Sequence, residues 1–571
     1  MEKKWNILPE GNAEILQNIQ TQLSVDRHIA LLLKHRNILS FEEAKKFFRP
    51  DLNDLHDPFL MKGMREAVDR IDRAIEKKEK ILIYGDYDVD GTTAVSIVYS
   101  FFKQHYPGLE YYIPDRYKEG YGISFSGIDY AAANQFSLII SLDCGIKAID
   151  KVAYANEKHI DFIICDHHLP GNIVPEALAI LDPKQSDCPY PYKELSGAGI
   201  GFKLIQAWSK QHNIDQEVSY NYLDLVATSI AADIVPITGE NRILTTFGLD
   251  RINKHPRPGI KALLALNQPK NAVSVHTLVF VLGPRINAAG RIEHGSKAVE
   301  LLISDNDTDA ELFAKAINET NNQRRDLDSG NTGEAIELLE NEIRVNKRYT
   351  TVLFNRNWHK GVIGIVASRL IDKYYRPTII LTESEGKISG SARSVKEFDI
   401  YTAIEQCSDL LEQFGGHKFA AGLTLKEENI EAFREKFELV VSGSIQPEHL
   451  VPRIDIDTEL EFHEISDKFL RILKQFTPHG PENMSPVFCA RQVFDTGWGQ
   501  VFGNNHLKLE LFQKSNPVLR FQAIAYDKGD YITFFQKKTP MDIVFKIQEN
   551  GYRGNGGIQL IIEDLRISQQ A

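Results

Sequence analysis

The sequence contains few cysteines and no long apolar run. Its 571 residues include only five cysteines, none of them in a C-x-x-C pair: Cys144, Cys165, Cys188, Cys407 and Cys489. An odd number without paired spacing argues against a disulfide framework or a structural zinc site and fits a reducing compartment. No apolar run approaches the ~18 residues that span a bilayer, and the opening MEKKWNILPEGN lacks the apolar core of a secretory signal. We therefore expect a soluble, cytoplasmic protein.

The chain also lacks an excess of positive charge. Lysine and arginine number 66 against 78 aspartates and glutamates, which gives a formal net charge of −12. Such a balance does not suggest a globally basic nucleic-acid binder. A local positive groove would still bind nucleic acid, and carboxylates that hold metal ions add to the acidic count. With 43% hydrophobic residues, a chain of this length can form about three to five domains with packed cores.

Short apolar runs alternate with helical patterns in the first third of the chain. We predict strands over 79–85, 137–143, 161–166 and 177–183, with helices over 92–104 and 147–159. This alternation predicts an α/β domain whose parallel sheet is covered by helices on both faces. Such sheets bind their ligands at the carboxyl ends of the strands.

The regions around this domain have other patterns. Residues 1–60 show helical apolar spacing, with Ser40 and Glu43 as a capping box. Further helices are predicted over 197–211 and 222–236. The charged stretch 307–344 has too little apolar surface for a buried element, so we interpret it as one or two connecting helices. A second alternation from 349 to about 445 predicts a smaller α/β domain, and the short alternating runs after about 450 predict a small β-barrel.

The most informative feature is the position of the acidic and histidine side chains. Three of the four predicted strands end in them, and one more aspartate ends an apolar helix: Asp86, Asp88, Asp90, Asp143, Asp166, His167, His168 and Asp233. Carboxylates packed at adjacent strand ends are costly unless cations neutralise them. Oxygen ligands with one or two imidazoles suit Mn²⁺ or Mg²⁺. Two ions roughly 3.5–4 Å apart would use all of these carboxylates and suit in-line displacement at phosphorus.

Each part of this pattern has an ordinary explanation on its own. The D-x-D-x-D-G run could be a calcium loop or a surface turn, although the EF-hand pattern fails because Ile97 stands at the twelfth position from Asp86. The D-H-H run alone is compatible with a solvated loop, and Asp233 alone with a helix end. Together, four such sites at predicted strand or helix ends favour a metal centre.

Several of these runs resemble the motifs of a known family. The D-Y-D-V-D-G run at Asp86, the strand-end Asp143, D-H-H and A-A-D-I-V resemble the four motifs of the DHH phosphoesterase superfamily. G-G-H-K-F-A-A-G, from Gly415 to Gly422, is similar to the signature of its accompanying DHHA1 substrate domain. Four longer segments resemble the RecJ family of single-strand-specific exonucleases: 113–122, 282–292, 358–370 and 389–394.

The resemblance implies a domain division for the chain. We expect an N-terminal helical segment at 1–60, a DHH catalytic domain at 61–305, a connecting helix at 306–345, a DHHA1 domain at 346–445 and an OB-fold barrel at 450–571. OB-folds track single strands with positive grooves and stacking aromatics.

The resemblance also implies which residues hold two Mn²⁺ or Mg²⁺ ions. Asp88 and Asp143 would hold one ion, with Asp86 in support. The other ion would be held by Asp90, Asp143, His167 and Asp233, so that Asp143 bridges the two. His168 would face the substrate phosphate.

A further set of residues would bind the strand itself. Arg116, Ser391 and Arg393 match family positions that hold a 5′ phosphate, and bidentate arginine contacts suit that group. Gly415, Gly416 and His417 lie in a glycine-rich loop that phosphate can approach closely. Plausible contacts to the following nucleotides are Arg285, Asn287 and Arg291.

The activity that the resemblance implies is 5′-to-3′ hydrolysis of single-stranded DNA to mononucleotides, in recombination and repair. A helicase and a single-strand-binding protein would be partners, and no membrane would be involved. One alternative is a phosphodiesterase of the same class for short oligonucleotides or cyclic dinucleotides. Another is an inactive single-strand-binding scaffold, which the presence of Asp88, Asp90, Asp143, His167 and Asp233 disfavours.

Overall fold

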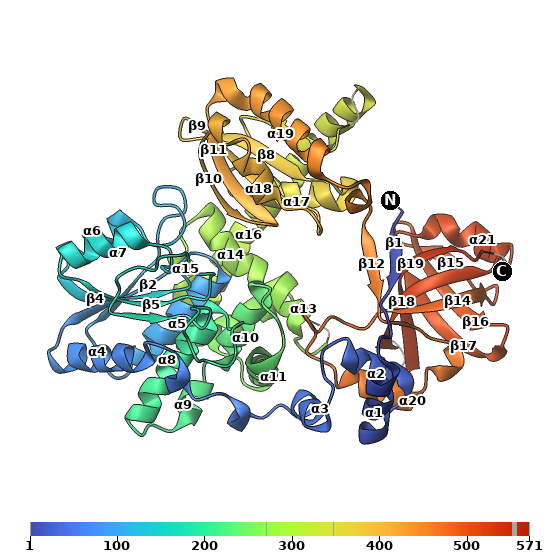
Figure 1. Cartoon of the computed structure of the whole chain (residues 1–571), viewed down its shortest axis with the longest axis horizontal. Helices are drawn as coiled ribbons and strands as arrows, with labels where there is room; N and C mark the ends of the chain where they lie inside the picture. The colour runs from blue at the N-terminus through green and yellow to red at the C-terminus, as the bar shows by residue number, and fades with distance from the viewer. Residues whose placement is uncertain (1, 270, 346–347, 551–556, 570–571) are drawn as a thin grey trace. The chain divides into compact units, whose positions relative to one another are not determined.

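The structure, a computed structural model, describes residues 2–269, 271–345, 348–550 and 557–569. They form two compact units (Figure 1). The first consists mainly of Asp57–Asp233 and Gly248–Pro452, and the second of Lys3–His56, Ile234–Phe247 and Arg453–Ala571. None of the described helices combines the length and apolar character that a membrane span requires.

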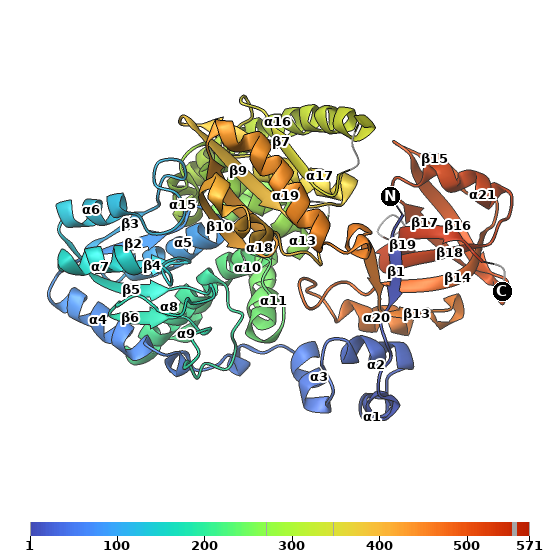
Figure 2. The same cartoon turned by 45° about the horizontal axis from the view of Figure 1, so that its top comes forward.

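The first unit contains a parallel sheet in the order β3-β2-β4-β5-β6 (Figure 2). Its strands are β2 (Lys80–Gly85), β3 (Leu109–Tyr112), β4 (Phe136–Leu142), β5 (Asp161–Cys165) and β6 (Ala179–Leu181). Helices α6 (Phe125–Ala133) and α7 (Ile149–Glu157) pack on one face through a core that includes Ile128 and Val152. The other face is packed by α5 (Val89–Lys103) and α8 (Gly197–Gln211), preceded in the chain by α4 (Met64–Glu76).

The predicted fold class and the four predicted strands are confirmed. The short strand β3 is not predicted, because L-E-Y-Y over four residues offers too little alternation to count as a signal. The predicted helix 222–236 is wrong at its end. The helix α10 spans Leu223–Ala232, Asp233 is its C-cap, and Ile234 has a left-handed φ of 60°. The chain therefore turns sharply at Asp233.

Further helices complete the first unit. Helix α9 (Gln216–Tyr220) precedes α10, and α11 (Gly239–Lys254) begins in the second unit and ends in the first. The others are α12 (Pro258–Ala265), α13 (Val275–Thr277), a π-helical turn (Leu278–Leu282), α14 (Gly283–Ile292), α15 (Ser296–Ile303) and α16 (Asp307–Val345). The connecting stretch forms one helix, and the expectation that it has too little apolar surface to be buried is wrong. Small and apolar residues at helical spacing, including Ala310, Ala314, Ile317 and Leu339, are buried along one side. Asp328, also buried, pairs with Arg369 at 2.6 Å.

A second, mixed sheet has the order β10-β11-β9-β8-β7. Its strands are β7 (Thr351–Phe354), β8 (Thr378–Ser384), β9 (Lys387–Arg393), β10 (Leu411–His417) and β11 (Ala420–Leu425). Helix α17 (Ile363–Tyr374) packs on one face together with α16, while α18 (Ile400–Glu405) and α19 (Ile430–Ser444) pack on the other. This arrangement confirms the smaller α/β fold.

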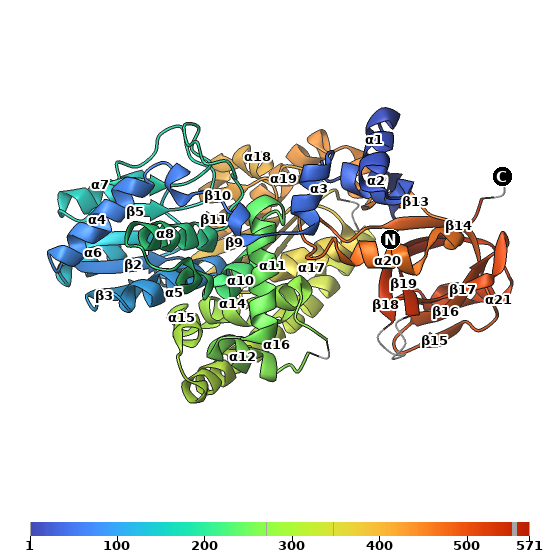
Figure 3. The same cartoon turned by 90° about the horizontal axis from the view of Figure 1, so that it is seen from below.

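The second unit is built around a closed β-barrel (Figure 3). The ring is formed by β14 (Phe488–Asp495), β18 (Met541–Asn550), β19 (Gly557–Ile567), β17 (Asn516–Ala525) and β16 (His506–Gln513), and β16 pairs back with β14. Three short strands accompany it, β12 (Arg453–Ile456), β13 (Thr458–Glu459) and β15 (Gln500–Phe502), with helices α20 (Asp467–Lys474) and α21 (Ile532–Gln536). The predicted barrel is confirmed.

The N-terminal segment packs with this barrel. Helices α1 (Ala13–Leu23), α2 (Arg27–Lys34) and α3 (Phe41–Phe48) share a core with it, and the Ser40–Glu43 capping box at α3 is present. The expectation of a purely helical segment is wrong, since β1 (Lys4–Ile7) pairs in parallel with β12. This pairing joins residues about 450 positions apart, so local sequence carries no signal for it.

A buried arginine ties three segments of the second unit together. The guanidinium of Arg242 donates to the carbonyls of Phe47, Gln475, Phe476 and Thr477 at 2.9–3.0 Å and to that of Pro478 at 3.4 Å. It also lies 3.8 Å from the centre of the Phe47 ring. Carbonyls at the end of α3 and after α20 that have no partner within a helix are thereby satisfied.

Replacing Arg242 by alanine should destabilise the second unit strongly. The carbonyls of Phe47, Gln475 and Thr477 would lose this donor, whereas those of Phe476 and Pro478 still accept from the Asn483 amide. We therefore expect a loss of about 3 kcal/mol in the free energy of unfolding. Urea titration followed by circular dichroism measures this loss. Arg27→Ala, at an exposed arginine of the same unit, is the matched control and should change stability by less than about 0.5 kcal/mol. Equal effects of the two variants would contradict the clamping role.

Candidate metal centre

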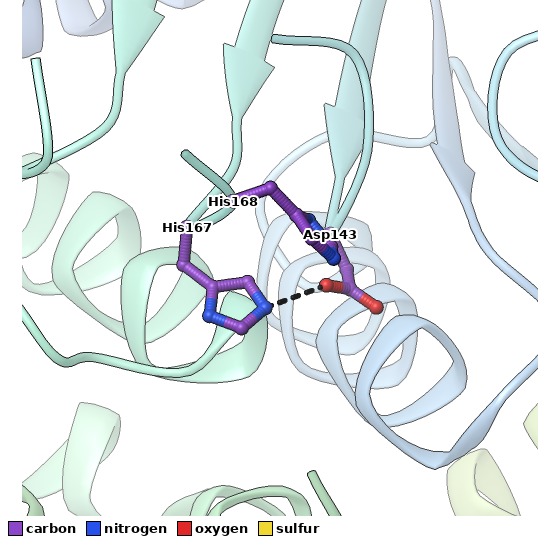
Figure 4. A group of neighbouring side chains, drawn as sticks. All are labelled: Asp143, His167 and His168. Carbon is purple, nitrogen blue, oxygen red and sulfur yellow. Dashed lines mark ion pairs between the residues drawn. The ribbon is translucent and has the colours of Figure 1, made fainter. Parts of the chain in front are cut away.

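The acidic and histidine residues meet at the carboxyl edge of the parallel sheet. Asp86 follows β2, Asp143 follows β4, and Asp166, His167 and His168 follow β5. The Nε2 atom of His167 lies 3.2 Å from Asp143 Oδ1, 3.4 Å from Asp233 Oδ2 and 3.6 Å from Asp90 Oδ2. Figure 4 shows the His167 ring directed at the Asp143 carboxylate. One imidazole nitrogen thus faces three carboxylates from three separate elements.

Buried atoms without hydrogen-bond partners show that the residues fit a cation. Among the described residues these atoms include Asp86 Oδ2, Asp143 Oδ1 and both ring nitrogens of His167. Two groups have ligand atoms within 4.8 Å of one another, Asp90–His167–Asp233 and Asp143–His167–His168. Buried oxygens and nitrogens of this kind are costly when unpaired and are the ligand types of Mn²⁺ and Mg²⁺. The donor set therefore fits a divalent-metal centre.

The electrostatics of the cluster agree with this fit. Burial, followed by the repulsion of neighbouring carboxylates, raises the pKa of Asp86, Asp88, Asp143 and Asp233 above the usual aspartate range. Burial also lowers the pKa of His167, which favours the neutral imidazole that binds metals. Without cations, the protein would have to keep several of these carboxyl groups protonated.

Asp90 is held by the start of helix α8. Its two carboxylate oxygens accept hydrogen bonds from the backbone N–H groups of Gly197 (2.7 Å) and Ala198 (2.8 Å), and from the hydroxyl of Ser229 (2.6 Å). A Cβ atom on Gly197 would lie 2.7 Å from the Cβ of Asp143, so only glycine fits there. Sequence reasoning missed Gly197 and Ser229. A small residue directly after the helix-capping Ser196 was the available signal.

Asp166 is another residue of the centre that sequence reasoning left out of the site. It accepts hydrogen bonds from the backbone N–H groups of His167, His168 and Ile146, and lies 2.7 Å from the Nδ1 atom of His168. Although burial opposes ionisation, these contacts lower the pKa of Asp166 to about 2. Burial likewise opposes the charged form of His168, but Asp166 raises the pKa of its imidazole to about 9. His168 is therefore a hydrogen-bond donor near neutral pH.

Two residues of the centre occupy or adjoin strained backbone. Asp143 has a left-handed φ of 59°, and Ile234, directly after Asp233, has 60°. Left-handed conformations are rare for residues other than glycine, and rarest for β-branched ones. The backbone reverses at both points, which directs the two carboxylates toward His167.

Beside the metal centre lies a group of partly buried arginines. Burial, and then the charges of Arg116 and Arg393, lowers the pKa of Arg291 to about 10. Burial and Arg116 also lower the pKa of Arg393. Among the described residues, none of these three guanidinium groups forms an ion pair with a carboxylate, so the group is suited to an anion. We call Arg116, Arg291, Arg393 and Ser391 the anion pocket.

The guanidinium of Arg393 is closely packed against Ser391 and Gly364. Its Nη1 atom donates to the hydroxyl of Ser391 at 3.1 Å. A Cβ atom on Gly364, in the first turn of α17, would come within 2.9 Å of that hydroxyl and within 2.8 Å of Arg393 Nη2. Helix N-termini carry partial positive charge, and sequence reasoning missed Gly364, whose signal lies in the W-H-K-G-V-I-G run.

The other residues predicted to bind the DNA strand lie in different surroundings. Asn287 and Arg291 line a cavity of about 180 Å³. The guanidinium of Arg285 instead donates to Asn318 Oδ1 at 3.1 Å and to the Val281 carbonyl at 2.8 Å. The remaining three residues are exposed at the end of β10: Gly415, Gly416 and His417. The expectation of a glycine-rich loop is wrong here, since these residues pair with β11. Besides burial, the charges of Arg393 and His168 lower the pKa of His417, which places this end of β10 near both parts of the site.

A carboxylate–histidine centre at the edge of a parallel sheet, with a glycine-rich strand of a second sheet nearby, defines the DHH class of phosphoesterases. Family models match here over residues 80–230 (DHH family, N-terminal domain), 346–443 (DHHA1 domain) and 456–564 (RecJ OB domain).

Individual relatives agree over nearly the whole chain. It is 35% identical over 570 residues to the single-stranded-DNA-specific exonuclease RecJ of Bacillus subtilis, covering 99% of this chain and 71% of the relative. Identity to RecJ of Escherichia coli is 32%, over 88% of this chain and 90% of that one. The crystal structure of Thermus thermophilus RecJ in complex with Mn²⁺ matches with a TM-score of 0.84 at 25% identity, covering 99% of this chain and 80% of that one. The chain therefore belongs to the RecJ family.

Removing the charge of Asp143 should stabilise the protein when no metal is present. Because its pKa is raised in the folded state, folding takes up a proton above about pH 4, so stability falls as the pH rises from there toward the raised pKa. At pH 8 with chelator, Asp143→Asn should unfold with a free energy about 1–2 kcal/mol higher than the parent. Urea titration at pH 5 and pH 8 measures this difference.

The same variant should gain less stability from added Mn²⁺ than the parent, because a ligand has been removed. Asp129→Asn, at an exposed aspartate of α6, serves as the control. A variant that is less stable than the parent in chelator and responds fully to Mn²⁺ would contradict the metal-ligand assignment.

Proposed function

We propose that the protein is a metal-dependent exonuclease that hydrolyses single-stranded DNA from the 5′ end to mononucleotides. The proposal depends on one observation: the anion pocket lies beside a cluster of buried metal-ligand atoms that have no hydrogen-bond partner. The relatives support this activity, since they are named single-stranded-DNA-specific exonucleases and one was crystallised with Mn²⁺.

The ligand assignment of the proposal uses the residues around His167. Asp88 and Asp143 would hold one Mn²⁺ or Mg²⁺ ion, with Asp86 in support. Asp90, Asp143, His167 and Asp233 would hold the other. When bound, such a pair of ions neutralises the phosphodiester and activates water for in-line attack at phosphorus.

The chain's own groups would position the strand around that reaction. His168, whose pKa is raised to about 9, would donate a hydrogen bond to the scissile phosphate while Asp166 holds its ring. The anion pocket would receive the 5′-terminal phosphate, and Asn287 in the adjoining cavity would contact a following nucleotide. Gly415, Gly416 and His417 would border the DNA strand on the side of the smaller sheet. Arg285, which donates to Asn318 of α16, would contact a following nucleotide.

The barrel would bind a more distant part of the strand. Aromatic side chains are exposed on it at Trp498, Phe502 and Tyr526, and the His506 ring lies 5.4 Å from Phe502 and 5.2 Å from Tyr526. Exposed aromatic groups of this kind stack on bases without regard to sequence. We further propose a cytoplasmic role in recombination and repair, with a helicase and a single-strand-binding protein as partners that supply single strands.

Digestion of end-labelled oligonucleotides tests this function. With a 5′ label and Mn²⁺, the first labelled product should be a mononucleotide, whereas a 3′ label should appear in a ladder of shortening strands. Chelator should stop both reactions. Asp143→Ala should lower turnover by about a thousandfold or more, whereas the exposed-site control Asp129→Asn should not. Labelled dinucleotides as the only substrate cleaved would instead support the alternative phosphodiesterase.

Loss of Arg393 should reveal the end that the enzyme recognises. Arg393→Ala removes a charge-assisted contact, so hydrolysis of 5′-phosphorylated strands should fall about tenfold to a hundredfold, with 5′-hydroxyl strands much less affected. Steady-state kinetics on both substrates measure the ratio. Arg356→Ala, at an exposed arginine of the same domain, is the control. Equal losses on both ends would contradict the role of the pocket.

A further inference from the structure

Tyr117 joins three segments of the first unit at the anion pocket. It belongs to the loop over 113–122, and its hydroxyl donates to the backbone carbonyl of Arg291 in the last turn of α14. Its ring also meets the imidazole of His359 edge-on, with the ring centres 6.2 Å apart at 82°. The catalytic domain and the smaller-sheet domain therefore both contact this one side chain.

Gly361 completes the junction from the side of the smaller sheet. Its carbonyl accepts a hydrogen bond from Arg291 Nη1 at 3.1 Å, and its N–H donates to His359 Nδ1 at 3.1 Å. A Cβ atom at this position would lie 2.4 Å from the Arg291 carbonyl oxygen and 2.7 Å from the Tyr117 hydroxyl. The three segments thus meet with no room for a side chain.

The junction acts on two of the three pocket arginines. Arg291 is held at both ends, by Tyr117 at its carbonyl and by Gly361 at its guanidinium. Arg116 precedes Tyr117 in the chain and lies with its guanidinium carbon 5.0 Å from the centre of the Tyr87 ring. The turn that contains Arg116 is itself held by Asp115, whose carboxylate accepts from the Tyr117 N–H at 2.9 Å.

We propose that Tyr117 is a positioning residue for the 5′ phosphate. Its hydroxyl, seated against Gly361, holds Arg116 and Arg291 in the arrangement that receives the terminal phosphate, and it does not touch the DNA. Guanidinium groups placed close together repel one another, so a pocket of three needs an external restraint to stay assembled without its anion. The inference rests on the proposed function, because it assigns the pocket to a 5′-phosphorylated strand.

The test uses two variants that open the same contact from opposite sides, Tyr117→Phe and Gly361→Ala. Binding of fluorescein-labelled oligothymidylate with a 5′ phosphate or a 5′ hydroxyl is measured by anisotropy in chelator, so that no hydrolysis occurs. Both variants should bind the phosphorylated strand about five- to tenfold more weakly and the hydroxyl strand within about twofold of the parent. The matched control is Tyr130→Phe on α6, which removes a hydroxyl that donates to Glu110 of β3 at 3.0 Å.

Kinetics with Mn²⁺ separate positioning from general damage. Tyr117→Phe should raise KM for the phosphorylated strand by a similar factor and leave kcat within about twofold. Equal weakening on both ends, a fall in kcat alone, or unchanged binding by Tyr117→Phe would overturn the inference, whatever the fate of Gly361→Ala. If the parent itself does not prefer a 5′ phosphate, both the pocket assignment and this inference fall. A preference lost in Arg393→Ala and kept in Tyr117→Phe overturns the inference alone.

Discussion

Three carboxylates from different parts of the chain lie within 3.6 Å of one imidazole nitrogen, and they repel one another in a largely buried place. Hydrogen bonds from the surrounding structure offset part of that repulsion. The start of α8 donates two backbone N–H groups to Asp90, and Asp166 gathers the loop that carries His167. The atoms that have no hydrogen-bond partner, Asp86 Oδ2 and Asp143 Oδ1 among them, are the ones that cations would satisfy.

A second cluster of opposite sign lies beside the first. Burial, then the neighbouring arginines, lowers the pKa of Arg291, and the Asp88 carboxylate opposes this shift in part. Such an arrangement separates the tasks that hydrolysis of a nucleic-acid end requires, since cations suit one cluster and phosphate the other. Glycines at 197, 361 and 364 let the backbones approach closely enough for both clusters to form.

The second unit also depends on a buried charged side chain, that of Arg242. Arg242 lies in the segment Ile234–Phe247 of the second unit, which begins directly after Asp233. Its guanidinium satisfies carbonyls from the N-terminal segment and from the chain that leads into the barrel. The polypeptide that carries a candidate metal ligand therefore continues without interruption into a segment anchored by the barrel unit.

Local sequence was enough to predict the alternation of strands and helices, the barrel, and the position of Asp143 and His167 at strand ends. Period-two and helical spacing are properties of neighbouring residues, and a buried strand that ends in an acid shows directly in the sequence. The same reasoning failed for the burial of α16, because single alanines spaced along a helix give a weak apolar signal.

Only the tertiary structure decided which distant residues support these groups. The contact of Gly197 with Asp143, the hydrogen bond from Ser229 to Asp90, and the junction of Tyr117 with Gly361 each join segments far apart in the chain. The pairing of β1 with β12 is of the same kind. The sequence by itself determined the elements and the chemical types at their ends, since these depend on nearest neighbours. Their distances and protonation depend on packing between elements, which short-range patterns do not encode.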